Sequence, residues 1–163
     1  MESALKTPEQ LLRYRPLAKI LADKPAGAYA VGPDSPVLAA VQLMADRNVG
    51  FVLVEADAKL VGVVSERDYA RKVILLGRSS KDTLVREIMT TSVVTVTLDR
   101  TVPECMALMH AGGFRHLPVV ADGKTVGVLS IRDLLKETVA HHERLIREME
   151  LERLTMQSGG SSY

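Results

Sequence analysis

The sequence lacks several features that mark large classes of protein. Its only cysteine, Cys105, excludes an internal disulfide bond and a zinc site built from several cysteines. The 21 Lys and Arg residues nearly balance the 20 Asp and Glu residues, so the chain lacks the basic excess of a nucleic-acid-binding domain. Its apolar runs are too short for a transmembrane helix, and its polar start, MESALKTPEQ, lacks the apolar core of a signal peptide. We therefore expect a soluble, cytoplasmic protein that binds neither nucleic acid nor a membrane.

Common signatures of catalytic and metal sites are also missing. The sequence contains no GxSxG elbow, no GxxxxGK[ST] phosphate-binding loop and no GxGxxG motif. The pair His141-His142 has no third ligand nearby and no HExxH pattern. We therefore expect neither an enzyme nor a metal-binding protein.

An internal repeat is the most informative feature that is present. Residues 31–68 align with residues 96–133 without a gap, at a constant offset of 65 positions, and 15 of the 38 aligned pairs are identical. The match is strongest where VGVVSERD (61–68) aligns with VGVLSIRD (126–133). The chain is therefore two copies of one unit with additional segments at its ends.

Each copy is expected to fold as β-α-β-β-α. A short apolar strand is followed by a helix whose apolar residues, at i, i+4 and i+7, form one buried stripe. Two strands joined by a tight turn come next, and a second helix begins just after the serine of the shared motif. Because a unit of about 50 residues buries little surface alone, the copies are expected to pack sheet to sheet and share one core. The expected strands cover residues 29–31, 50–54 and 60–64, then 93–96, 116–120 and 125–129, and the stripes are Val37, Val41 and Met44, then Val102, Met106 and Met109.

Segments outside the repeat carry helical patterns of their own. Leu17, Ile20 and Leu21 indicate a short helix before the first copy. The last helix is expected to continue through HHERLIREMELERL (141–154), where Leu145, Ile146, Met149 and Leu154 lie partly along one side. Two interpretations of this extension stay open: a solvated terminal helix and a helix that builds a dimer.

The doubled unit ending in G-V-V/L-S-x-R-D resembles the CBS domain family, named for cystathionine beta-synthase. Two further segments, IMTTSVVTV (88–96) and FRHLPVV (114–120), are also similar to that family. The resemblance implies an α+β fold of two tandem repeats packed sheet to sheet with pseudo-two-fold symmetry, a cleft that binds an adenosine-containing ligand, and a homodimer. On this basis the chain divides into an extension (1–16), repeat one (17–76), repeat two (77–138), a C-terminal helix (139–156) and a flexible tail (157–163). The residues that carry the resemblance are Gly62, Ser65 and Asp68 in the first copy and Gly127, Ser130 and Asp133 in the second.

The Ser-x-x-Asp pair of each copy has two interpretations. Serine at the N-cap and aspartate in the first turn stabilise a helix start whatever the function. A carboxylate also accepts hydrogen bonds from two neighbouring hydroxyls, which is the pattern that a ribose presents. By resemblance, Asp68 and Asp133 would bind ribose hydroxyls, while Ser65 and Ser130 would contact ribose or phosphate. Replacing either aspartate by alanine is then expected to weaken one site.

A phosphate needs positive charge or free N–H groups. Arg115 and His116, just before the LPVV strand of the second copy, are the best candidates in the sequence. The first copy has Gly50 and Phe51 at the matching positions, so the two sites are expected to differ.

Two further sets of residues complete the expected site. Arg67 and Arg132 lie between the serine and the aspartate of each copy, where they are either phosphate contacts or a solvated helix start. By resemblance, an adenine base would lie between apolar walls. The wall residues are Val93, Val94, Leu117 and Pro118.

Together these features favour a regulatory module that binds AMP and signals to a partner protein. ATP, ADP and NAD(H) are the alternative ligands. The alternative functions are a small enzyme that acts on a nucleotide and a structural dimer whose cleft is vestigial.

Overall fold

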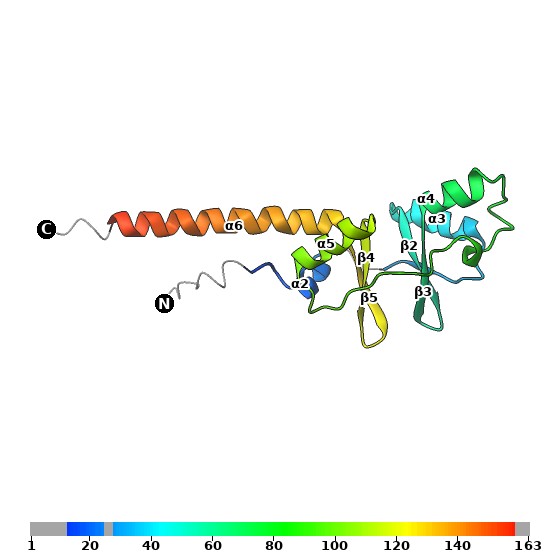
Figure 1. Ribbon diagram of the computed structural model, residues 1–163, viewed down its shortest axis with the longest axis horizontal. Helices are drawn as coiled ribbons and strands as arrows, with labels where there is room; N and C mark the ends of the chain where they lie inside the picture. The colour runs from blue at the N-terminus through cyan, green and yellow to red at the C-terminus, as the bar shows by residue number, and fades with distance from the viewer. Residues whose placement is uncertain (1–12, 25–27, 159–163) are drawn as a thin grey trace.

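The computed structural model describes residues 13–24 and 28–158, which form two small α/β units and a long helical arm (Figure 1). Most of the expected extension (1–16) and of the expected tail (157–163) lies outside the described residues. The elements are α2 (Leu17–Ala22), β1 (Ala30–Val31), α3 (Val37–Arg47), β2 (Phe51–Ala56), β3 (Lys59–Ser65), α4 (Glu66–Tyr69), the π-helix η1 (Ala70–Ile74), the 3-10 helix η2 (Val85–Glu87), α5 (Val102–Gly112), β4 (His116–Ala121), β5 (Lys124–Ser130) and α6 (Ile131–Ser158).

The two sheets repeat the same hairpin but differ at the first strand. In the first repeat, β1 pairs in parallel with β2, and β2 pairs antiparallel with β3. In the second repeat the sheet contains only the antiparallel pair β4 and β5. The prediction of a strand over residues 93–96 is wrong. In this segment a single parallel bridge, from Val96 to Val119, takes the place of a strand. The other expected strands are confirmed to within two residues at each end.

The helices that follow the first strands bury one side each. The expected middle residues of the two stripes, Val41 and Met106, are only partly buried. The buried positions follow an i, i+3, i+7 spacing instead, which is an equally good helical stripe. The buried residues are Val37, Ala40 and Met44 on α3, and Val102, Cys105 and Met109 on α5.

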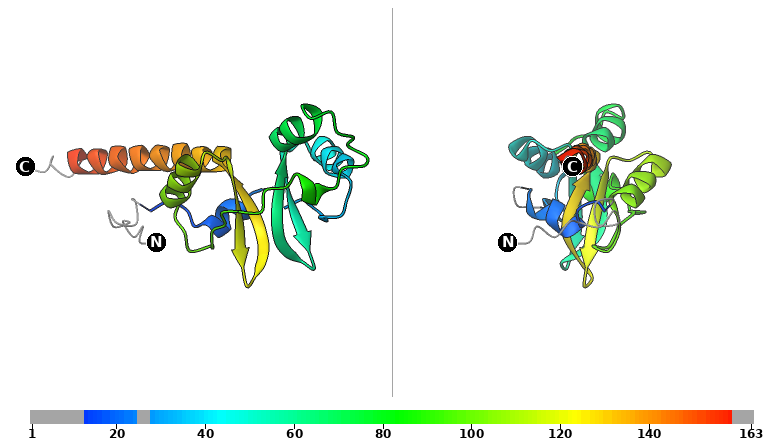
Figure 2. Two further views of the ribbon diagram at one scale, coloured as in Figure 1. Left: turned by 45° about the vertical axis from the view of Figure 1, so that its right-hand side comes forward. Right: turned by 90° about the vertical axis from the view of Figure 1, so that its left-hand side faces the viewer.

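The second helices begin where the motif predicts and then differ greatly in length. Ser65 caps α4, which runs for four residues before the chain continues as the π-helix η1. In the second repeat, α6 begins directly after Ser130 and continues for 28 residues. Figures 1 and 2 show its C-terminal half projecting from the body as an arm. The expected extension of the last helix is therefore confirmed.

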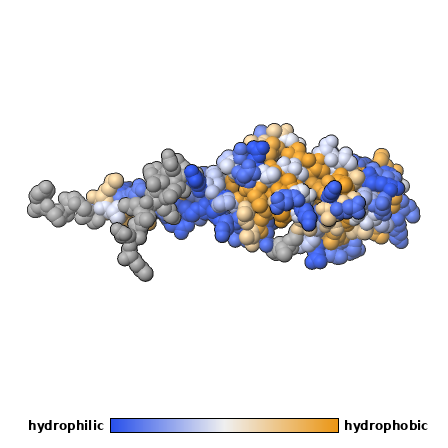
Figure 3. Space-filling view, turned by 90° about the horizontal axis from the view of Figure 1, so that it is seen from below, coloured by the Kyte–Doolittle hydropathy of each residue, from blue (hydrophilic) through white to orange (hydrophobic). Residues whose placement is uncertain are grey.

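Buried apolar side chains form two clusters, one in each repeat, so the expectation of a single shared core is wrong. The second cluster includes Leu17 and Ile20 of α2, which packs against β5. Residues 17–22, which we expected to belong to the first repeat, thus complete the core of the second. The reason is that the second repeat is a two-stranded sheet, and such a sheet needs an additional apolar layer to be stable. Figure 3 shows apolar residues gathered over the body, with hydrophilic residues toward both ends.

The two repeats meet through their sheets. Strands β3 and β5 are in contact, and both hairpins lie side by side in Figure 2. Phe51, the first residue of β2, stacks on His116, the first residue of β4, with ring centroids 4.9 Å apart and planes only 6° from parallel. These residues occupy the same position in the two copies, since they are 65 positions apart. The stack therefore lies where the pseudo-two-fold relation brings the repeats together.

The hairpin turns allow a direct test of backbone strain. Asp57-Ala58 and Asp122-Gly123 all have positive φ angles, between 49° and 74°, as a two-residue type I′ turn requires. Ala58 carries a Cβ in this left-handed region, whereas Gly123 does not.

Ala58→Gly should therefore raise the free energy of unfolding, measured with urea, by roughly 0.5–1 kcal/mol. Gly123→Ala, the reverse change at the matching position, should lower it by a similar amount. Equal stability of the Ala58→Gly variant and the parent would contradict the strain.

Candidate functional site

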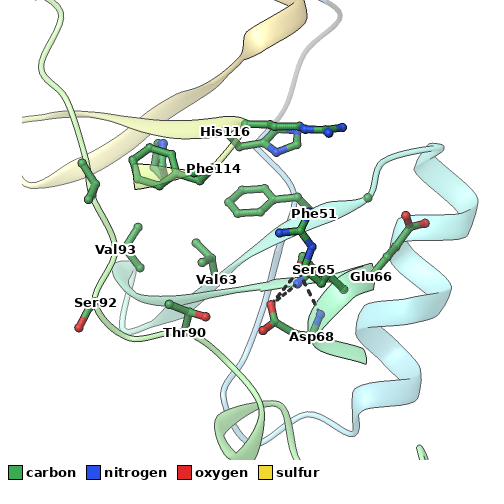
Figure 4. Close-up of a pocket in the computed structure, with 16 residues that line it drawn as sticks. Phe51, Val63, Ser65, Glu66, Asp68, Thr90, Ser92, Val93, Phe114 and His116 are labelled. Carbon is green, nitrogen blue, oxygen red and sulfur yellow. Dashed lines mark hydrogen bonds between the residues drawn. The ribbon is translucent and has the colours of Figure 1, made fainter. Parts of the chain in front are cut away.

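A cleft of about 550 Å³ lies between the two repeats. Its walls come from both copies and from the segment that joins them (Figure 4). The volume falls in the range of small-molecule sites. The lining residues are Gly50, Phe51, Val63, Ser65, Glu66, Arg67, Asp68, Thr90, Ser92, Val93, Val94, Gly113, Phe114, Arg115, His116 and Pro118.

Ser65 and Asp68 lie on one side of the cleft, at the junction of β3 and α4. They form a capping box: the Asp68 amide donates to Ser65 Oγ at 3.2 Å, and the Ser65 amide donates to Asp68 Oδ2 at 3.0 Å. Ser65 Oγ also donates to Asp68 Oδ2 at 2.8 Å, and Lys72 Nζ lies 2.8 Å from Oδ1. The helix-start interpretation is therefore confirmed. The contacts also hold the carboxylate, whose side chain is 16% exposed, at the edge of the cleft.

Aromatic side chains face this pair across the cleft. Figure 4 shows Phe114 and His116 on the side of the second repeat, with Phe51 near them. Phe114 packs so closely over Gly112 that an added Cβ would lie 2.0 Å from its ring. Burial lowers the pKa of His116, and the nearby Lys24 lowers it further. His116 is therefore neutral near pH 7. The positive charge on this wall of the cleft comes from the exposed side chain of Arg115.

The joining segment supplies the third side of the cleft. Val63 and Thr90 exchange backbone hydrogen bonds of 3.0 and 2.9 Å, which fix the segment against β3. Thr90, Ser92 and Val93 follow one another along this side in Figure 4. Two hydroxyl residues, Thr90 and Ser92, are therefore followed along this side by two apolar ones, Val93 and Val94.

Most of the predicted site residues meet in this one cleft, and some do not. Leu117 is fully buried in the apolar cluster of the second repeat, so its expected place in an adenine wall is corrected. The reason is strand alternation, which turns Leu117 to the core and Pro118 to the cleft. Ser130, Arg132 and Asp133 are not among the lining residues. Those that do line it are Ser65, Arg67, Asp68, Val93, Val94, Arg115, His116 and Pro118.

The second Ser-x-x-Asp pair repeats the capping geometry in different surroundings. The Ser130 amide donates to Asp133 Oδ2 at 2.7 Å, and the Asp133 amide donates to Ser130 Oγ at 3.2 Å. Lys24, which follows α2, donates from Nζ to the same Asp133 oxygen at 2.7 Å. Burial of Asp133 opposes its ionisation, but the hydrogen bonds from Lys24 and Ser130 outweigh that effect and lower its pKa.

Several lining residues were not predicted. Phe51 was noted only as an uncharged match to His116, although its place in the repeat was the available signal. The hydroxyl residues Thr90 and Ser92 lie within IMTTSVVTV, and Phe114 lies within FRHLPVV. Both segments are similar to the CBS domain family. Nothing in a single sequence shows which of their side chains turn inward. The lining residues outside the prediction are Gly50, Phe51, Val63, Glu66, Thr90, Ser92, Gly113 and Phe114.

The described residues offer neither a metal site nor a membrane-spanning helix. Residues 13–24 and 28–158 contain no group of three or more His, Cys, Asp or Glu side chains placed to hold a metal ion. Among the helices within those same ranges, none combines the length and the apolar character that crossing a membrane requires.

Comparison with known proteins agrees with this architecture. The family model for the CBS domain matches residues 24–74 and 85–140. A mitochondrial CBS domain-containing protein of Arabidopsis thaliana, CBSX3, is 40% identical over 126 residues, which are 74% of this chain and 59% of that protein. A second Arabidopsis relative, CBSCBSPB2, is 35% identical over 118 residues, which are 72% of this chain but only 22% of that protein. The chain thus spans between about a fifth and three fifths of these curated relatives.

Solved structures show the same fold. A protein with CBS domains from Burkholderia ambifaria MC40-6 is 45% identical, with a TM-score of 0.73 over 77% of this chain and 95% of that chain. The CBS domain pair of protein MJ0100, which was solved in complex with 5′-methylthioadenosine and S-adenosyl-L-methionine, is 22% identical, with a TM-score of 0.66 over 78% of this chain and 98% of that chain. Because the family model matches both repeats and covers most of the sequence, the chain belongs to the CBS domain family and contains a tandem pair of its domains.

Proposed function

We propose that this chain is a regulatory module that binds an adenosine-containing nucleotide, with AMP as the first candidate, and passes the signal to a partner protein. The observation that supports it best is the position of Asp68. Its carboxylate lies at the edge of a cleft of about 550 Å³, opposite a wall of aromatic rings. The MJ0100 pair, which binds adenosine compounds, shares this fold, but the ligand class of this chain rests on its own cleft.

The Asp68 carboxylate suits a ribose. The capping box and Lys72 occupy one hydrogen bond direction on Oδ1 and two on Oδ2, and they hold the group in one orientation. A carboxylate has about four acceptor directions, so one remains on Oδ1 for a hydroxyl donor, and rotation of the Ser65 hydroxyl would free a second on Oδ2. Two adjacent sugar hydroxyls are donors of the right spacing for one carboxylate.

The remaining parts of a nucleotide match the other walls. Val63, Val93 and Pro118 give apolar surface on which a base can lie, and Phe51 and Phe114 add flat rings. The guanidinium groups of Arg67 and Arg115 line the same cleft and favour an anionic group such as a phosphate. The same charges disfavour a sulfonium, which places S-adenosylmethionine behind AMP for this chain. ATP, ADP and NAD(H) contain the same adenosine and phosphate, and remain alternatives.

A regulatory role follows from a binding site formed by two bodies. A ligand that contacts both repeats stabilises the arrangement in which both walls are correctly placed, and shifts the population toward it. We propose no catalytic step. A nucleotide-converting enzyme and a structural dimer with a vestigial cleft are the alternatives that turnover and binding assays separate.

Removing the Asp68 carboxylate should abolish most nucleotide affinity. Hydrogen bonds to a charged group contribute about 1.5–3 kcal/mol each, so Asp68→Ala should weaken AMP binding roughly 10- to 100-fold in calorimetric titration. Asp133→Ala is the matched control, since it removes the same capping pair without altering a residue that lines the cleft. Parent affinity in Asp68→Ala would refute ribose binding here. No binding of AMP, ATP or NADH by the parent would favour the vestigial cleft.

Arg115 should read the phosphate and not the nucleoside. Arg115→Ala should weaken AMP about tenfold, because one charge-assisted contact is lost, and should leave adenosine affinity within twofold of the parent. Arg132→Ala is the control, because Arg132 is an exposed arginine outside the cleft. An equal loss for AMP and adenosine would assign Arg115 a structural role instead.

We further propose that α6 forms a homodimer through its projecting half. Its exposed apolar side chains occupy five of the seven positions of a seam with the three-and-four spacing of a two-stranded coiled coil, and His142 and Arg153 occupy the other two. An identical seam on a second copy is the partner that satisfies it with the symmetry of a dimer. The seam residues are Leu135, Val139, Ile146, Met149 and Met156.

A double substitution in this seam should break the dimer. Ile146→Glu with Met149→Glu should convert the sedimenting species to monomer, because two charges would be buried at the centre of the seam. Leu151→Glu is the matched control, since Leu151 is an exposed apolar residue of α6 that lies off the seam. A parent that sediments as a monomer, or a double variant that remains a dimer, would refute this interface.

A further inference from the structure

Glu66 brings a second carboxylate to the cleft, apart from that of Asp68. It is the first residue of α4, and its side chain is exposed and lines the cleft. In Figure 4 it points toward the side of β2, whereas Asp68 points toward Thr90. A Cβ added to Gly50 would lie 2.9 Å from Glu66 Oε2, so the carboxylate fills the space that a side chain at position 50 would take.

The second copy carries the opposite charge at the equivalent place. Arg115 matches Gly50, and Ile131 matches Glu66, each 65 positions further on. In the first copy the Glu66 amide donates to the Gly50 carbonyl at 3.1 Å. In the second, the Ile131 amide donates to the Arg115 carbonyl at 2.8 Å, so the backbone contact is the same. One repeat therefore presents a carboxylate where the other presents a guanidinium group.

The ring stack between the repeats keeps these two charges near each other. Gly50 directly precedes Phe51, and Arg115 directly precedes His116, whose ring centroid lies 4.9 Å from that of Phe51. Consecutive Cα atoms are only about 3.8 Å apart. The carboxylate beside Gly50 and the side chain of Arg115 thus flank the stack, and both line the cleft that a single ligand would occupy.

The phosphate of a nucleotide is expected on this side of the cleft. Val63 and Val93 offer apolar surface for a base along the joining segment, and Asp68 is the proposed ribose contact. The base and the 5′-phosphate are attached at opposite ends of the ribose ring. A base on the side of the joining segment therefore directs the phosphate toward Glu66 and Arg115.

The charges around the cleft suit a short anion. Lys72 lies 2.8 Å from Asp68 and balances its charge, which leaves the two arginines Arg67 and Arg115 against the one carboxylate of Glu66. A single phosphate ester carries a charge of about −1.5 to −2 at pH 7. Each further phosphate adds negative charge near Glu66, and the described residues that line the cleft supply no further cation to balance it.

We infer that Glu66 restricts this cleft to nucleotides with a single phosphate, by repelling the longer phosphate chains of ADP and ATP. This inference rests on the proposed function, because the ribose position at Asp68 places the phosphate. Repulsion between like charges acts over several ångströms without contact, and salt weakens it. Glu66 is therefore a specificity-determining residue that AMP itself does not have to touch.

Removing this charge should narrow the preference for AMP. Glu66→Gln should lower the ratio of the ATP to the AMP dissociation constant about fivefold in calorimetric titration at low salt, because one like charge near the added phosphates is lost. Glu66→Asp keeps the charge and should keep the ratio within about twofold of the parent. Glu55→Gln is the matched control, since it removes an equal charge from β2 outside the cleft.

Salt separates repulsion from a structural effect of the substitution. At about 1 M NaCl the screening length falls to about 3 Å, so the ratio for Glu66→Gln should approach that of the parent. A ratio that stays shifted at high salt would overturn the repulsion. So would a parent that binds ATP as tightly as AMP at low salt.

The outcomes also separate this inference from the proposed function. If Glu66→Gln keeps the parent ratio while Asp68→Ala loses AMP, the restriction is overturned and the proposed function stands. Tripolyphosphate, a probe without ribose or base, covers the opposite case. It should raise the Tm of Glu66→Gln more than that of the parent or of Glu55→Gln. That result in a chain that binds no AMP would refute the proposed function and support the repulsion, whereas equal Tm shifts would overturn the repulsion.

Discussion

The stack of Phe51 on His116 joins two bodies that each have their own apolar core. The rings lie 4.9 Å apart and nearly parallel, at the same position of the two copies. Aromatic pairs of this kind contribute about 0.5–1.5 kcal/mol beyond the area that they bury. Their larger effect here is geometric, because the stack joins β2 of the first repeat to β4 of the second beside the cleft that both residues line. Burial and the nearby Lys24 lower the pKa of His116 and keep it neutral near pH 7, which leaves positive charge at the cleft to the arginines.

A doubled sequence would by symmetry give two equal sites, and this chain departs from symmetry at a small number of positions. Arg115 and His116 stand where the first copy has Gly50 and Phe51. Each aspartate pairs with a lysine, but Lys72 reaches Asp68 from the π-helix η1, whereas Lys24 reaches Asp133 from the segment after α2. The capping geometry of the two Ser-x-x-Asp pairs is nearly the same in both copies. The difference between the sites therefore comes from the segments that reach them and not from the motif.

The N-terminal segment has a second role as part of the folded body. Leu17 and Ile20 enter the core of the second repeat, and Arg15 contacts the buried carboxylate of Glu137 on α6 through its amide, at 3.2 Å. Glu137 also accepts a hydrogen bond from Arg144 at 2.7 Å, which balances its charge in a site where an unpaired carboxylate would be costly. These contacts connect the start of the chain with the helix that leads into the arm. The segment that carries Lys24 is thus held along the second repeat from Arg15 onward.

The repeat, the hairpins and the helix starts could be predicted from the sequence, because each depends on residues close together in the chain. The 65-residue offset aligns Asp57 with Asp122 and Ser65 with Ser130, and turn and cap geometry are local properties of such residues. The motif segments also led to half of the residues that line the cleft. Tertiary structure alone decided that Leu117 turns to the core while Pro118 faces the cleft, that α2 packs on the second repeat, and that Lys24 meets Asp133 across 109 positions. Those outcomes depend on which distant segments share a surface, and periodicity within one segment carries no information about its neighbours.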